Sequence, residues 1–299
     1  MEPNDNTTGT IRNGIDTTRT TVRGNETGRV IVRDSASHRS KVSLVVDRLR
    51  RWVPMWMISP AALLLLWEIC ARLGFIEVRF FPAPSTILAK LWELIGTAGF
   101  WIDVGTSLRR MFIGFFMGAI PGLIVGLAMG LFRPVREIFQ PLVAALYPLP
   151  KIAILPLILL IFGIGELSKY VIVAIGVFFL MTINTFAGVA NIPPIYFDVA
   201  RNLRASRWNI YLTVALPGAL PGIFTGLRVC MGVALLLLVA AEFVGAEEGI
   251  GYRIWWAWSV FWVTNMYVGF AVIALLGFLS AYFVDWLERR FLPWQRRQT

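Results

Sequence analysis

Histidine, cysteine and lysine are scarce in this chain of 299 residues, and their scarcity excludes several kinds of chemistry. The single histidine, His38, lies in a polar stretch, so a Ser-His-Asp catalytic arrangement is not expected. The histidine and the two cysteines are not spaced as metal ligands. None of the four lysines lies in a Gly-x-x-x-x-Gly-Lys-Ser/Thr phosphate-binding loop. We therefore expect neither enzymatic activity nor a bound metal or cofactor in this chain.

Charged residues make up only 15% of the chain, whereas soluble proteins contain about a quarter. Hydrophobic residues make up 57%, and several runs reach the roughly 20 residues needed to cross a bilayer. Because these runs do not alternate with period two, they predict helices and not barrel strands. The formal charge of +10 is typical of basic residues beside membrane spans, so nucleic acid is not an expected partner. The sequence thus predicts an all-α membrane protein.

The chain divides by composition into polar ends and a membrane domain. Residues 1–40 predict a disordered cytoplasmic tail, and residues 41–53 predict an interfacial helix. Residues 54–290 are the predicted transmembrane domain, and residues 291–299 are a second cytoplasmic tail. We expect about six spans, at 54–74, 104–132, 138–163, 167–190, 217–245 and 262–285. If both termini lie in the cytoplasm, most arginines outside the spans fall in cytoplasmic segments, as is typical of membrane proteins. We therefore expect this orientation, in which residues 246–261 are periplasmic.

Two of these spans have unusual composition. The span 138–163 contains four prolines, which predict a kinked or partly re-entrant helix. The span 104–132 carries a glycine at every fourth position, and this spacing predicts a smooth ridge for close helix packing. The ridge consists of Gly114, Gly118, Gly122, Gly126 and Gly130. Tight packing within one subunit is favoured, and a helix that slides as a gate opens is the alternative.

Ionisable residues within the spans bear on the mechanism of transport. Arg228 and Glu242 lie 14 positions apart, too far along one helix to pair directly. The sequence therefore predicts no buried ionisable pair and no proton relay of the kind that ion-coupled carriers use. Asn184, Arg228 and Glu242 are candidate pathway-lining residues. Arg109, Arg110, Arg228 and Lys151 could each attract an anion, but we favour an interpretation as topology or interfacial charges.

Residues 191–216 interrupt the apolar spans with charged residues. Asn191 and the prolines after it predict a helix start, and Ser206 predicts the cap of a second short helix that Pro217 ends or kinks. This pair of amphipathic helices is predicted to dock onto a partner. The alternative is a surface helix pair on anionic lipid.

This loop resembles the Glu-Ala-Ala loop of permease subunits of ATP-binding-cassette importers. In that pattern three further residues precede a glycine, and nine more precede a final Ile-x-Leu-Pro. The chain has Asp198-Val199-Ala200, then Arg204 at the glycine position, then Val214-Ala215-Leu216-Pro217, with matching spacing. Arg204 departs from the pattern, and a left-handed turn there would cost about 1 kcal/mol. The residues that the resemblance assigns to docking are Asp198, Val199, Ala200, Leu203, Arg204, Arg207, Leu216 and Pro217.

The segments FPAPSTIL (81–88) and VAAEFVGAEEGIGYRI (239–254) are similar to the branch that imports nitrate, sulfonates, taurine and bicarbonate. The resemblance implies a type I importer permease in the bacterial inner membrane that forms the pathway for a small anion. It implies separate ATPase subunits that hold ATP and Mg²⁺, a periplasmic binding protein, and a second permease copy, in a homodimer. A stand-alone secondary transporter and a membrane scaffold without transport are the alternatives.

Overall fold

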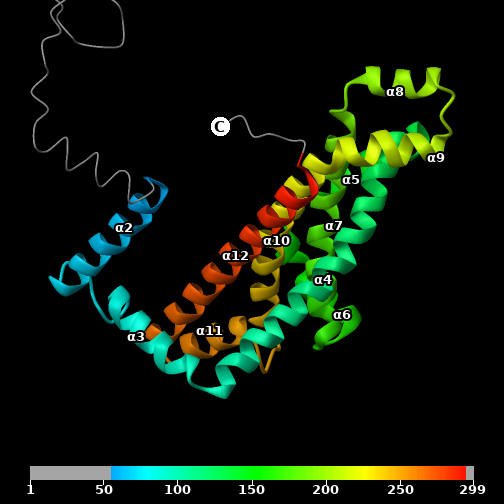
Figure 1. The fold of residues 1–299 in the computed structure, drawn as a ribbon. Coiled ribbons are helices and arrows are strands. Elements are labelled where there is room, and N and C mark those ends of the chain that lie inside the picture. The colour runs from blue at the N-terminus through cyan, green and yellow to red at the C-terminus, as the bar shows by residue number, and fades with distance from the viewer. Residues whose placement is uncertain (1–54, 294–299) are drawn as a thin grey trace, which may run out of the picture. The chain divides into compact units, whose positions relative to one another are not determined.

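The computed structural model describes residues 55–293, and every regular element in this range is helical. The predicted tail 1–40 and the predicted interfacial helix 41–53 lie outside the described residues, as do residues 294–299 of the second tail. The chain divides into two units, with the boundary between Leu65 and Leu66. The described part of the first unit is entirely within α2 (Met55–Arg72). The remaining described helices all belong to the second unit (Figure 1).

Four helices of the described chain are long and apolar enough to cross a membrane. They are α4 (Ala98–Leu131), α7 (Glu166–Ala190), the continuous run Arg207–Glu242 that ends in α10 (Leu216–Glu242), and α12 (Val263–Phe291). A bent helix pair counts as a fifth if it forms one span. Five of the six predicted spans therefore have counterparts among these helices. The remaining predicted span, 54–74, corresponds to α2, which is not one of the helices counted as long and apolar enough.

The predicted third span is broken in the middle. Helix α5 (Arg133–Leu146) is followed by the short 3-10 helix η1 (Lys151–Ile154) and α6 (Leu155–Phe162), at an angle of 88°. The kink predicted from the prolines is confirmed. The Lys151 ammonium donates to the carbonyl oxygen of Leu146, the last residue of α5, and to those of Tyr147 and Leu149 just after it, at 2.7–3.1 Å. Lys151 thus caps the break, where a cation complements the negative helix end.

The centre of the bundle is the contact between α4 and α7, and it runs along the glycine ridge. A Cβ atom added at Gly122 would lie 2.7 Å from the Phe178 carbonyl oxygen, and one at Gly126 would lie 2.6 Å from that of Thr182. Side chains at these positions would collide with the backbone of α7, so glycine is what allows the two helices to touch. The structure places the ridge in packing within one chain, which was the favoured of the two interpretations.

Two apolar clusters surround this contact. The larger one joins α4, α6, α7 and α10, and includes Met111, Val177 and Leu238. The smaller one joins the start of α4 to three helices, α3 (Pro84–Ile95), α11 (Ile250–Ser259) and α12. Helices α3 and α11 lie in segments that the sequence analysis assigned to loops outside the membrane, and both are too short to have been predicted as spans.

Candidate functional site: the α8 loop and a buried charge network

The α8 loop, residues 191–206, joins α7 to the long helix that begins at Arg207, and it lies at one end of the bundle (Figure 1). Its helix α8 (Pro194–Asn202) starts on proline, as predicted, but Asn191 is the C-cap of α7 and does not cap α8. The side chains of Tyr196, Val199 and Leu203 are 59%, 49% and 77% exposed. No other part of the described chain packs against this apolar helix face. Such a face is typical of an element that docks onto a partner.

The turn after α8 has the left-handed geometry that the family glycine would favour. Arg204 has φ = 52°, and its amide donates to the Arg201 carbonyl at 2.9 Å. A non-glycine residue in this conformation costs roughly 1 kcal/mol. The Ser206 hydroxyl accepts a hydrogen bond from the Asn209 amide at 3.2 Å, so its predicted cap is confirmed. Arg204 therefore occupies the glycine position of the pattern in a left-handed conformation.

The second short helix predicted for this loop is not separate. Helix α9 (Arg207–Ile210) continues through a π-helical segment, η2 (Tyr211–Ala215), directly into α10. The prediction that Pro217 ends this run was wrong, because Pro217 lies in the first turn of α10, where a missing N–H is tolerated. Leu216 and Pro217 thus belong to the base of a span and not to an exposed loop.

The other predicted docking residues differ in exposure. Asp198 forms an exposed ion pair with Arg201 at 3.2 Å, within α8 itself. Ala200 is only 9% exposed and faces the bundle, unlike its neighbour Val199. The α8 surface that a partner could contact is therefore formed by Tyr196, Val199 and Leu203 and the charged residues beside them.

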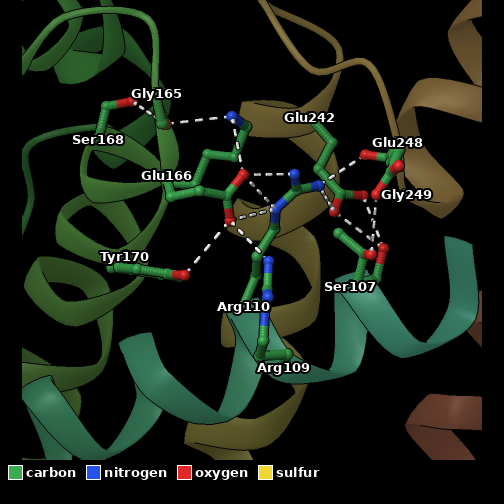
Figure 2. Close-up of polar contacts among 12 residues, drawn as sticks. Ser107, Arg109, Arg110, Gly165, Glu166, Ser168, Tyr170, Glu242, Glu248 and Gly249 are labelled. Carbon is green, nitrogen blue, oxygen red and sulfur yellow. Dashed lines mark hydrogen bonds and ion pairs between the residues drawn. The ribbon is translucent and has the colours of Figure 1, made fainter. Parts of the chain in front are cut away.

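A buried charge network lies at the far ends of α7 and α10 (Figure 2). Glu242, the last residue of α10, has no exposed surface and pairs with Arg110 of α4 at 2.8 Å. The Arg110 guanidinium, 5% exposed, also donates to Glu166, the first residue of α7, with its Nε at 2.9 Å from Oε2. The prediction that no buried ionisable pair exists was wrong, because the partner comes from another helix, 132 positions away in sequence.

The same network holds the start of α11. The amides of Gly249, Ile250 and Gly251 donate respectively to Asp103, Ser107 and Glu242, at 2.8–2.9 Å. Figure 2 shows the Ser107 hydroxyl, on α4, directed at the Glu242 carboxylate, with both oxygens at 2.8–2.9 Å. Three of the N–H groups that a helix start leaves free are thus bonded by side chains of α4 and α10.

The remaining sequence candidates are also engaged. Arg228 forms ion pairs with Asp285 and Glu288 of α12, and so supports the contact between α10 and α12. Neither Arg228 nor Glu242 presents an unpaired charge to a pathway. The Asn184 side chain donates to the Leu180 carbonyl at 2.8 Å and lines an open groove between α7, the α8 loop and α10. Sequence reasoning missed Asp103, Ser107 and Glu166, whose partners lie on other helices.

The comparisons with known proteins decide the family. Residues 114–297 match the model for "Binding-protein-dependent transport system inner membrane component". The chain belongs to this family. It is therefore a multi-pass inner-membrane permease of an ATP-binding-cassette importer, a transport subunit and not an enzyme, and such permeases work with an ATPase and a binding protein.

Individual relatives support this assignment over most of the chain. The permease is 37% identical to the taurine transport system permease protein TauC of Escherichia coli (strain K12), over 82% of this chain and 91% of that protein. It is 34% identical to the putative aliphatic sulfonates transport permease protein SsuC of Bacillus subtilis (strain 168), over 80% and 88%. It is 30% identical to the nitrate import permease protein NrtB of Leptolyngbya laminosa, over 84% and 91%.

Solved structures share the fold. A chain of the inward-facing MetNI methionine ABC transporter aligns with a TM-score of 0.57 at 21% identity, covering 64% of the permease and 96% of that chain. A chain of a bacterial ABC transporter for the acidic polysaccharide alginate aligns with a TM-score of 0.56 at 15% identity, over 83% and 98%. The all-helical importer fold expected from the resemblance is confirmed.

Proposed function

We propose that the permease couples ATP hydrolysis to anion import by docking α8 onto its ATPase subunit. The observation that carries this proposal is the exposed apolar face of α8, held at the end of the bundle between two long helices. Val199 and Leu203 fill a cleft on the ATPase. Asp198 and Arg207 orient the contact through charge-assisted hydrogen bonds, which are stronger than neutral ones. ATP and Mg²⁺ bind to that partner.

The proposed substrate is a small anion of the sulfonate or nitrate class. The basis is what the relatives transport according to their names: taurine, aliphatic sulfonates and nitrate. The open groove that contains Asn184 is also lined by two further polar side chains, those of Thr213 and Thr225. Neutral hydrogen-bond donors suit a small anion that has to be released again. We place the pathway along this groove, with Asn184 as its polar contact.

The proposed assembly contains two permease copies as a homodimer, two ATPase subunits on the cytoplasmic side and a periplasmic binding protein. Both termini and the α8 loop are cytoplasmic, and the loop at Glu248 is periplasmic. Single cysteines at Ser206 and Glu248, treated with an impermeant thiol reagent on intact cells, test this topology. Labelling at position 248 alone is expected, and labelling at position 206 alone would overturn it.

The docking test uses Leu203→Glu, with Leu203→Met as the matched control that keeps the apolar contact. Because Leu203 is exposed in the single chain, Leu203→Glu should insert and fold normally. We expect its affinity for the ATPase to fall by about 1–4 kcal/mol, as for truncation of a docked contact. Ala200→Glu is less informative, because Ala200 faces the bundle.

The measurement is the amount of ATPase that copurifies with each permease variant, together with uptake of taurine, sulfonate and nitrate by whole cells. Asp198→Lys, which reverses an exposed charge, should also reduce copurification. Normal copurification and uptake with both Leu203→Glu and Asp198→Lys would leave α8 as a lipid-surface helix, and the docking proposal would fail.

A further inference from the structure

We infer that Arg110 joins the far ends of the two helices that flank the α8 loop, and that it transmits movement of this loop to α11. This assigns a positioning residue for transport to a part of the permease remote from the ATPase. The inference rests on the proposed docking of α8.

The first step is the connectivity of the chain. The α8 loop lies between the last residue of α7, Ala190, and Arg207, where the helix leading into α10 begins. A movement of the loop therefore acts on one end of α7 and one end of the long helix. The opposite ends of these two helices are Glu166 and Glu242, and the single Arg110 guanidinium bonds both carboxylates.

The second step is stiffness. Helix α7 has 25 residues without a proline, so it extends about 37 Å as a continuous rod. The glycine ridge of α4 contacts its backbone, and Gly222 of α10 packs against it at Gly188. Close-packed helices move as bodies and do not deform continuously. A displacement at Ala190 therefore reaches Glu166, and with it Arg110.

The third step links Arg110 to α11. The Nη1 atom of Arg110 donates to the Glu248 carbonyl at 2.6 Å, one residue before the α11 amides that the network holds. Gly249 has φ = 120°, and a Cβ atom added at Gly251 would lie 2.7 Å from the Glu242 Cβ. Only glycine allows the start of α11 to lie this close to Glu242. The position of α11 is thus tied directly to Arg110 and Glu242.

A purely structural role for Arg110 makes a different prediction. If Arg110 only stabilises the fold, its substitution changes assembly and other properties that do not depend on nucleotide. If Arg110 transmits movement, its substitution changes how α11 responds to nucleotide. Arg109 provides the matched control: it is the adjacent arginine, its side chain is 60% exposed, and it lies 3.5 Å from the same Glu166.

The experiment uses the full permease–ATPase complex with Cys70 and Cys230 replaced and a bimane fluorophore on a cysteine at the exposed Trp258 of α11. The probe is ATP with Mg²⁺ and vanadate, which traps the closed ATPase. The change in bimane emission on trapping is compared for the native network, Arg109→Gln, Arg110→Lys, and the double variant Arg110→Gln/Glu242→Gln.

The double variant removes both buried charges together, and Glu166 keeps Lys169 as a cation at 3.7 Å, so the complex is expected to assemble. We expect at least a fivefold smaller emission change in this variant with ATP hydrolysis within twofold of native. Arg110→Lys keeps the charge but loses the two-sided guanidinium fork, and should reduce the change at least twofold. Arg109→Gln should respond as the native complex does.

A native-sized emission change in the double variant or in Arg110→Lys would overturn the inference while leaving docking intact. If the double variant does not assemble, Arg110→Lys alone decides in the same way. If the native permease fails to bind its ATPase, the docking proposal fails, and the transmission inferred from it fails with it.

Discussion

The two ends of the α7–α10 pair differ in how they use charge. At the α8 end, the ion pair between Asp198 and Arg201 is exposed and local, three positions apart in sequence. At the other end, Arg110 and Glu242 are buried and 132 positions apart. An exposed pair contributes little to stability, whereas loss of one partner from a buried pair leaves an uncompensated charge. The charges at the α8 end can therefore leave one ion pair for another, whereas the buried charges at the Arg110 end hold a fixed geometry.

The largest expected effect tests the buried end. Glu242→Ala removes one of the two carboxylates that pair with Arg110 and leaves the buried Ser107 hydroxyl and Gly251 amide without their acceptor, and it should lower the free energy of unfolding by about 3–5 kcal/mol. Glu137→Ala is the control, because Glu137 forms an exposed pair with Arg133 and should cost less than about 1 kcal/mol. Chemical denaturation in detergent micelles measures both. Equal effects would mean that burial does not distinguish the two pairs.

The next effect concerns the contact that joins the two ends. Gly126→Leu forces a side chain into the α7 backbone and should destabilise the permease by about 1–3 kcal/mol or more. Gly105→Leu, on the same helix, is the control, because a Cβ atom there has no neighbour within 4 Å. Thermal unfolding and uptake compare the pair. Full activity of Gly126→Leu would show that the ridge tolerates separation of α4 from α7.

The smallest effect concerns the exposed end. Arg204→Gly removes a side chain from a left-handed position and should stabilise the α8 turn by about 1 kcal/mol at most, since glycine also gains freedom in the unfolded chain. Copurification of the ATPase should stay at the native level. Loss of the ATPase from Arg204→Gly would show instead that the Arg204 side chain itself forms part of the docking surface.

The membrane spans and the α8 loop could be predicted from the sequence, because each depends on residues within one short segment. Apolar runs give spans, and Asp198, Ala200, Arg204 and Pro217 have fixed spacing within one segment. The broken third span was predictable from its prolines. The start of the fifth span was not predictable from its proline. Proline is common both in the first turn of a helix and just beyond the end of one, so Pro217 alone does not tell which of the two occurs.

From sequence alone it follows that this chain is a helical membrane protein with several apolar helices long enough to span a bilayer, and that a polar loop interrupts them at residues 191–206. Which charges pair with one another depends on how the helices pack. Arg110 resembles a charge near a span end until α7 and α10 place Glu166 and Glu242 beside it. The physical reason is that an ion pair depends on distance in space, and periodicity within one helix cannot report contacts among residues that are 56 or 132 positions apart.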